Sequence, residues 1–219
     1  GKEDVMFSEM ELQLYGYDAS LNRGRPDCIV MPASTEEVSR VVKFARENGI
    51  PVVARGAGTN LSGGSSPTRG GIAMLFTRMN RILEIDVENQ RVVVEPGAIT
   101  LDIKGAIGKY GYLYHPDPSS EKATTIAGNL GENAGGAHCF KYGVTSNHIL
   151  GAEIVLYDGE VIEIGGKSLD NPGFDLPGLL VGSEGTLGMV TKLTLRMMPK
   201  TEAVKTMLAI YDTIADGAN

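Results

Sequence analysis

Long apolar runs, basic clusters and a cysteine framework are all missing from this sequence. The longest apolar runs cover only a few residues, far short of the ~20 that a membrane-spanning helix needs, and we recognise no signal peptide. The formal net charge is −7, and no Lys and Arg patch would follow a phosphate backbone. We therefore expect no transmembrane segment, no nucleic acid partner and a cytoplasmic protein. Cys28 and Cys139 could form one bridge at most, so we expect free thiols.

Glycine is what the sequence has in excess. There are 29 glycines in 219 residues, about 13% against a usual ~7%, while 42% hydrophobic and 21% charged residues are typical of a folded globular protein. A chain of this length can bury the core of one large domain or of two small lobes. We expect one unit with two lobes.

The first clear pattern is a strand, a helix and a second strand. Residues 28–31 and 50–54 are apolar, and the segment between them carries apolar positions at helical spacing. Ser34 and Glu37 have the spacing of a capping box at the start of that helix. Short links predict a βαβ unit, whose strands are parallel.

Further elements follow by the same reasoning. We expect a helix over residues 103–110, and a hairpin formed by residues 81–87 and 91–95. Apolar runs predict strands over residues 72–76, 152–157, 161–164, 190–197 and 202–213.

Three glycine-rich segments carry the chemistry. Residues 55–64, RGAGTNLSGG, follow a strand directly, and glycines let backbone N–H groups converge on an anion such as pyrophosphate. The context fits neither a P-loop nor a Rossmann fingerprint. A flexible surface loop would explain the segment equally well if it stood alone. Its place after a βαβ strand favours a binding role.

The other two segments are residues 116–136 and 182–188. Small residues in the first make a smooth surface for a flat ring, and Asn129 and Asn133 offer amide groups, although tight turns are the alternative reading. In the second, GSEGTLG, Ser183 can cap the following turn. A long irregular stretch inside a compact domain favours function.

The three histidines do not indicate a metal. His115, His138 and His148 are too far apart for an HxxxH site, and lone histidines are more often structural. No arrangement typical of a Ser or Cys nucleophile is present either. We expect no metal ligands and no catalytic residues in this span.

Together, the three segments resemble the FAD-binding domain of FAD-linked oxidases of the vanillyl-alcohol-oxidase superfamily, near the glycolate oxidase flavoprotein subunit and D-lactate dehydrogenase group. The similarity runs from YGYDAS at residues 15–20 to VGSEGTLGMVTKLTLR at residues 181–196. It implies an α+β fold with FAD between two lobes: a small βαβ lobe with parallel strands, and a larger lobe with an antiparallel sheet flanked by helices. The implied boundaries are an arm at 1–25, a first lobe at 26–97, a second lobe at 98–200 and, at 201–219, the start of a truncated substrate domain.

The resemblance also implies cofactor contacts. The loop that begins at Arg55 would hold the pyrophosphate, and the later segments would lie along the flavin and the rest of FAD. The implied residues are Arg55, Gly56, Ala57, Gly58, Thr59, Asn60, Leu61, Pro118, Ser119, Thr125, Gly128, Asn129, Asn133, Gly135, Gly136, Tyr142, Gly143, Glu184, Gly185 and Val190. Relatives with covalent FAD carry His where this chain has Thr59, so noncovalent FAD is expected.

A few positions depart from the family pattern. Ala127 and Gly131 exchange the Gly and Ala that relatives more often carry, which keeps both side chains small. Pro177 stands where Thr is common, and nothing in the sequence explains it. Gly1 replaces an initiator Met, and family members are roughly twice as long, so we expect a piece of a longer protein.

The implied function is the FAD-binding part of a 2-hydroxy-acid dehydrogenase or oxidase. Glycolate or D-lactate would become the 2-oxo acid, with the base outside this span and electrons leaving to an iron–sulfur or electron-transfer flavoprotein partner. Such partner subunits could also bring the protein to the periphery of a membrane. Two alternatives are a flavin-carrying electron-transfer subunit without a substrate site, and an NADPH-dependent flavin reductase of cell-wall synthesis. The GSEGTLG segment and the C-terminal extension disfavour the reductase.

Overall fold

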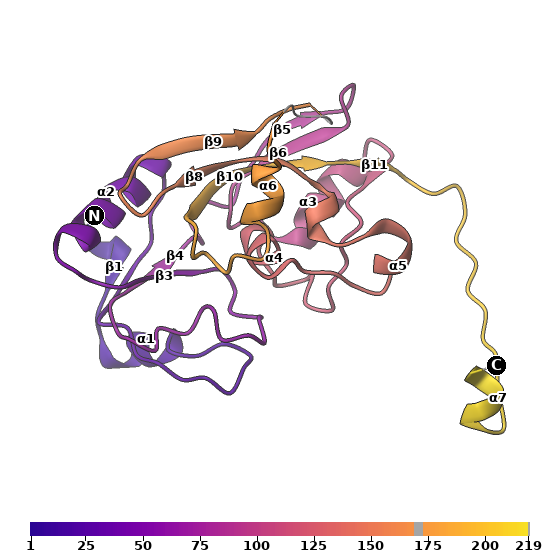
Figure 1. Ribbon diagram of the computed structural model, residues 1–219, viewed down its shortest axis with the longest axis horizontal. Coiled ribbons are helices and arrows are strands. Elements are labelled where there is room, and N and C mark those ends of the chain that lie inside the picture. The colour runs from indigo at the N-terminus through magenta and orange to yellow at the C-terminus, as the bar shows by residue number, and fades with distance from the viewer. Residues whose placement is uncertain (169–172, 219) are drawn as a thin grey trace.

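Two β-sheets organise the chain in the computed structural model, which describes residues 1–168 and 173–218 (Figure 1). The first sheet has the order β1-β2-β4-β3, and it comprises β1 (Val5–Met6), β2 (Cys28–Val30), β3 (Val52–Arg55) and β4 (Ile72–Leu75). β2 and β3 both run parallel to β4, which lies between them, and β1 pairs antiparallel with β2. The predicted parallel strands of the small lobe are confirmed.

The crossover helix α2 (Thr35–Glu47) links β2 to β3. Its apolar face is buried through Val38, Val42 and Ala45. The Ser34 side chain accepts the Glu37 N–H at 3.3 Å, as a capping box requires. The Glu37 carboxylate, however, accepts the N–H of Ala33 at 2.8 Å instead of that of Ser34. The Glu37 carboxylate therefore caps the N–H of the residue before the N-cap, and the reciprocal bond of a capping box is not formed.

The second sheet is antiparallel throughout, with the order β5-β6-β10-β8-β9. Its strands are β5 (Ile82–Asp86), β6 (Arg91–Val94), β8 (Ile149–Val155), β9 (Val161–Gly165) and β10 (Met189–Arg196). Helices α3 (Thr100–Gly108), α4 (Ile126–Glu132) and α6 (Leu176–Leu180) lie beside this sheet (Figure 1). Their apolar side chains form one core with those of β6, β8 and β10. The predicted larger lobe with its flanking helices is confirmed.

The lobe boundary expected at residue 97 does not coincide with the division between the two sheets. The hairpin β5–β6 precedes residue 97 but belongs to the second sheet, because β5 pairs with β6 and β6 pairs with β10. Val92, Val93 and Val94 of β6 are all buried, as in a strand with a neighbour on each edge. The hairpin sequence identifies β5 as one neighbour but does not identify the sheet that supplies the other.

The two sheets share a core. Val38 and Val42 of α2 cluster with Met74 and Phe76 near β4 and with Val155 and Met189 of the second sheet. Smaller elements complete the fold: η1 (Lys2–Asp4), α1 (Glu9–Leu14), β7 (Tyr112–Leu113) paired with β11 (Met198–Pro199), α5 (Cys139–Tyr142), η2 (Thr145–Asn147) and α7 (Ile214–Ala218). None of the helices described is long and apolar enough to cross a membrane.

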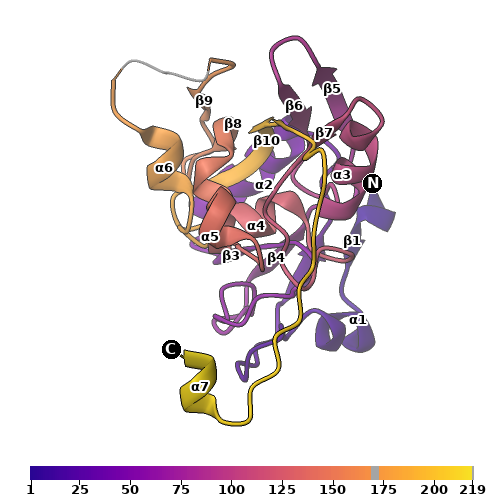
Figure 2. The ribbon, with the colours of Figure 1, turned by 90° about the vertical axis from the view of Figure 1, so that its right-hand side faces the viewer.

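The C-terminal segment leaves the body of the molecule after β11 and ends in α7 (Figures 1 and 2). Residues 202–213 are extended or bent but form no strand, so the predicted strand is wrong for this structure. The apolar pattern is present, but a strand also needs a neighbour with which to exchange backbone hydrogen bonds, and this segment pairs with none of the described strands.

Candidate functional site

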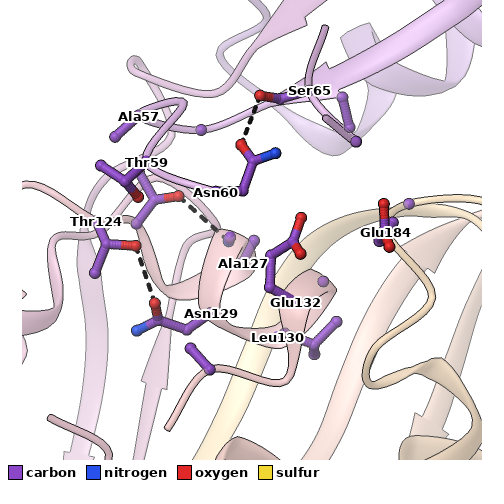
Figure 3. Close-up of a pocket in the computed structure, with 18 of the residues that line it drawn as sticks. Ala57, Thr59, Asn60, Ser65, Thr124, Ala127, Asn129, Leu130, Glu132 and Glu184 are labelled. Atoms are coloured by element: carbon purple, nitrogen blue, oxygen red, sulfur yellow. Dashed lines mark hydrogen bonds between the residues drawn. The ribbon is translucent and has the colours of Figure 1, made fainter. Parts of the chain in front are cut away.

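A cleft of about 310 Å³ is lined by the three glycine-rich segments. One wall is the loop after β3, the second is α4 with the residues before it, and the third is the turn between α6 and β10 (Figure 3). Its volume falls within the range of small-molecule and cofactor sites, about 300–1,000 Å³. The order of the segments along the chain and their meeting at one cleft agree with the prediction of a binding role.

The loop after β3 is held by the N-terminal arm. Asn60 donates its amide to the Asp18 carboxylate at 2.8 Å, and the Ala19 N–H donates to the Gly58 carbonyl at 3.1 Å. Within the loop, Ser65 donates to the Asn60 side-chain oxygen at 2.7 Å (Figure 3). Burial works to raise the pKa of Asp18, but hydrogen bonds from Ser20 and Asn60 outweigh it and lower the pKa, so the carboxylate stays charged.

Two glycines of this loop have no room for a side chain. Gly58 has φ +69°, and a Cβ on it would lie 2.4 Å from Arg55 Nη2. A Cβ on Gly56 would lie 2.2 Å from Thr125 Oγ1 at the start of α4. The loop therefore packs against its own arginine on one side and against the second lobe on the other.

Arg55 is a buried cation in the lining of the cleft. Its side chain is 6% exposed, donates through Nη1 to the Ser65 carbonyl at 3.2 Å and lies over the ring of Tyr15. Burial lowers the pKa of Arg55, although a guanidinium stays protonated. Its Nε has no hydrogen-bond partner among the described residues. A buried charge with an unused donor is costly unless an anion completes it.

Helix α4 begins at Thr125, whose side chain accepts the Gly128 N–H at 3.3 Å. Asn129 is 2% exposed, and its side-chain oxygen accepts from the Thr124 hydroxyl at 2.9 Å (Figure 3). Its side-chain nitrogen donates to the Thr100 hydroxyl at 2.7 Å. Asn129 lines the cleft, but both ends of its amide are engaged within the protein. Its part in the site is to position α4.

The third wall supplies a second unpaired donor. Ser183 Oγ is buried without a partner in the described part of the chain, so the cap predicted for this residue is not formed. The turn is tied to α4 by the Gly182 N–H on the Leu130 carbonyl, at 2.9 Å, and the Glu184 N–H on the Gly131 carbonyl, at 3.0 Å.

Two acidic side chains also line the cleft, Glu132 at the end of α4 and Glu184 in the third wall (Figure 3). Ser62, across the cleft in the loop after β3, lies 2.9 and 2.8 Å from the two oxygens of Glu132 and donates its proton to this carboxylate. Burial is the main cause that raises the pKa of Glu132, and the carboxylates of Glu184 and Asp18 raise it further, while the bond from Ser62 acts in the opposite direction.

Most of the expected contact residues line this cleft. They are Arg55, Gly56, Ala57, Gly58, Thr59, Asn60, Leu61, Pro118, Ser119, Thr125, Gly128, Asn129, Glu184, Gly185 and Val190. The other five, Asn133, Gly135, Gly136, Tyr142 and Gly143, lie outside the lining.

Three of those five residues make contacts within the protein. Asn133, in the left-handed conformation that ends α4, accepts the Ser146 N–H at 3.0 Å. The Gly136 N–H donates to Cys139 Sγ at 2.7 Å, and the Tyr142 ring stacks on His115 with centroids 3.6 Å apart. Their contact with a cofactor stays a prediction.

Some residues that line the cleft or hold its loop were not expected. Gly64 and Glu132 stand inside glycine-rich segments and Ser65 directly follows one, so their neighbours in sequence were the available signal. Phe76 and Leu180 are ordinary core residues by pattern, and Asp18 acts from the distant arm. Among the described residues, no three His, Cys, Asp or Glu side chains are placed to hold a metal ion.

Solved structures share this fold. Alkyldihydroxyacetonephosphate synthase superposes with a TM-score of 0.81 at 23% identity, over 92% of this chain and 39% of that one. A sequence model described as FAD binding domain matches residues 26–165. The chain thus shares the fold of these structures, and the sequence match shows that it belongs to the FAD binding domain family. The expected cofactor, FAD, is confirmed.

Curated relatives cover nearly the whole chain. It is 47% identical over 216 residues to glycolate oxidase subunit GlcD of Bacillus subtilis, covering 98% of this chain and 46% of that protein. Identity is 40% to GlcD of Escherichia coli, covering 96% and 42%, and 39% to a D-lactate dehydrogenase of Anaerostipes hadrus, covering 96% and 43%. The chain therefore spans less than half the length of these relatives.

The residues of the cleft fit FAD. The unused Nε of Arg55 and the unused Oγ of Ser183 are buried donors in its lining, where a phosphate or a polar ring edge can accept from them. Gly56 and Gly58 keep the loop backbone free of side chains, which permits close approach of an anion. Gly128, Gly131 and Ala127 have little or no side chain, so a flat ring can lie close to the backbone of α4.

Proposed function

We propose that this chain is the FAD-carrying part of a flavin-dependent dehydrogenase or oxidase that converts a 2-hydroxy acid, glycolate or D-lactate, to the 2-oxo acid. The similarity to GlcD of Bacillus subtilis, 47% identity over 98% of the chain, carries the proposal. The D-lactate dehydrogenase of Anaerostipes hadrus supports the same class of substrate.

Different residues of the cleft would contact different parts of the cofactor. Backbone N–H groups of residues 56–61 and the guanidinium of Arg55 would hold the pyrophosphate, and Pro118, Ser119 and the small residues of α4 would lie toward the flavin. The chemistry that FAD would supply when bound is that of a hydride acceptor for C2 of the hydroxy acid. The buried side chains around Asn129 keep α4 fixed, so that the ring is oriented and water is excluded from one side of it.

Attachment of the cofactor is noncovalent in this proposal. Thr59 lines the cleft where relatives with covalent FAD carry a histidine, and a threonine hydroxyl is not a nucleophile of comparable strength. The expected signature is a flavin that denaturation and filtration release quantitatively from the protein.

The remainder of the catalytic machinery lies outside residues 1–219 in this proposal. Val204, Met207, Leu208 and Ile210 are 80–92% exposed along the extended segment, and apolar side chains at this exposure need a covering domain or subunit. We assign residues 201–219 to the start of the substrate domain, which supplies the base. The GlcD relatives are named as subunits, which supports a partner subunit for this chain. In this proposal the partner is an iron–sulfur or electron-transfer flavoprotein, which would bring the chain to the periphery of a membrane.

Two measurements test this function. The purified chain is loaded with FAD, desalted and examined for a stoichiometric flavin spectrum; a folded chain that retains none contradicts the cofactor site. The full-length protein is then mixed anaerobically with glycolate and D-lactate. Bleaching of the flavin absorbance is expected with one of them, whereas no bleaching by any 2-hydroxy acid would favour an electron-transfer subunit.

A further inference from the structure

The charge in the cleft does not match its cofactor. The pyrophosphate of FAD carries two negative charges. Among the described residues that line the cleft there is one cation, Arg55, against two carboxylates, Glu132 and Glu184, and Asp18 holds the loop from the arm. Like charges brought into a partly desolvated site repel strongly. Either the cofactor binds against this repulsion, or one of the carboxylates does not remain charged.

Geometry singles out Glu132. Glu132 Oε1 and Glu184 Oε2 both lie within 3.4 Å of the place that a Cβ on Gly64 would take, so the two carboxylates converge on one point of the wall. Glu132 is half-buried and Glu184 is exposed, so the solvent screens Glu184 more effectively.

The groups around Glu132 come from every element that packs there. Ser62 reaches it from the loop after β3, Glu184 from the turn before β10, and Asp18 from the arm. Arg55 also lines the cleft, but its guanidinium lies against Gly58 and donates to the Ser65 carbonyl. Among the described residues, Ser62 is the one that donates a hydrogen bond to the charged carboxylate, through a single hydroxyl proton.

We infer that Glu132 takes up a proton when FAD binds and is a neutral carboxylic acid in the loaded cleft. Because Glu132 lines the same cleft as Arg55, FAD bound there would remove water from the carboxyl and add negative charge to the cleft, and both effects would favour the neutral form. In its neutral form Glu132 does not repel the anionic cofactor, and its role in the cleft is that of a positioning residue. This inference rests on the proposed FAD site.

The test is the pH dependence of FAD binding to the unmodified chain. For one proton taken up, the Kd rises by up to tenfold per pH unit, so we expect binding to weaken at least about tenfold between about pH 5 and about pH 8. Calorimetry in two buffers of different ionisation heat counts the proton directly, with an expected uptake near one in the middle of this range. Tight binding with no proton uptake overturns the inference and leaves the proposed function standing.

Three variants separate Glu132 from other groups that titrate. Glu132→Gln is expected to bind FAD with a flat pH profile, at about the low-pH affinity of the unmodified chain. Glu184→Gln removes a negative neighbour and should move the midpoint to lower pH, while Ser62→Ala removes the bond to the charged form and should move it to higher pH. A purely structural role for Glu132 predicts no such opposite shifts, and a slope that persists in Glu132→Gln assigns the proton elsewhere and overturns the inference.

The two failures can be told apart. If the unmodified folded chain binds no FAD at any pH, the proposed function falls with the inference. If Glu132→Gln fails to fold, the proton count on the unmodified chain and the opposite shifts of the other two variants still decide.

Discussion

Asp18 in the N-terminal arm and Asn60 in the loop after β3 are joined by a hydrogen bond of 2.8 Å across 42 residues of sequence. Asp18 is 5% exposed and also accepts the Ser20 N–H at 2.9 Å. The arm is therefore part of the structure that holds the cofactor loop.

Replacing Asp18 tests this link. Asp18→Ala leaves the Asn60 amide and the Ser20 N–H without their acceptor, which should cost about 1–3 kcal/mol of unfolding free energy and weaken FAD binding about tenfold. Denaturant unfolding and flavin fluorescence titration measure the two effects. The control is Asp86→Ala, in the β5–β6 hairpin, where stability falls but FAD affinity stays; unchanged affinity in Asp18→Ala would show that the arm does not shape the loop.

Gly58 provides a test of the pyrophosphate loop. Gly58→Val forces a branched residue to φ +69° and places its Cβ 2.4 Å from Arg55 Nη2, so FAD affinity should fall by at least about tenfold. Gly105→Ala is the matched control, since nothing lies within 4 Å of a Cβ in that exposed turn of α3. It should leave binding unchanged and stabilise the helix by about 0.5–1 kcal/mol. Normal FAD affinity in Gly58→Val contradicts the loop assignment.

Asn129 should matter more for stability than for chemistry. Asn129→Ala leaves the buried Thr124 hydroxyl without its acceptor and removes the donor to the Thr100 hydroxyl, at an expected cost of about 1–3 kcal/mol in denaturant unfolding. The exposed Asn80→Ala should change stability by no more than about 0.5 kcal/mol. Equal effects at both sites would mean that the amide does not hold α4.

His148 makes the fold sensitive to acid. Its side chain is 1% exposed, its Nε2 donates to the Tyr142 carbonyl at 3.0 Å, and burial lowers its pKa. In the unfolded chain His148 binds a proton at about pH 6.5, whereas in the folded chain it binds one only at lower pH. The free energy of unfolding is therefore largest above about pH 6.5 and falls as the pH drops toward the folded pKa, by at most about 1.4 kcal/mol per pH unit. His148→Gln should flatten this slope in denaturant titrations between about pH 7 and about pH 5. An unchanged slope would assign the acid sensitivity to other groups.

Local patterns in the sequence predict local structure here. The apolar spacing around Val38 and Val42 predicts α2, and the alternation on each side of residues 88–90 predicts the β5–β6 hairpin. The three glycine-rich segments predict the walls of the cleft because glycine has no Cβ and therefore leaves its backbone accessible to a ligand.

Long-range partners could not be predicted in the same way. The pairing of β6 with β10, the reach of Asp18 to Asn60 and the meeting of Ser62 with Glu132 each join residues far apart in sequence. Residues 202–213 show the converse, since their apolar pattern is that of a strand whose partner is not among the described strands. Tertiary context decides such cases.

β10 is the last strand of the large sheet to be synthesised, and it is the middle one. It pairs with β6, about a hundred residues earlier in the chain, and with β8, and the third wall of the cleft immediately precedes it. During translation, the early strands thus emerge with an open edge and no finished cleft, a state of high contact order that folds slowly and exposes apolar surface. The three walls of the cleft are therefore complete only when residues 182–188 and β10 have joined the sheet.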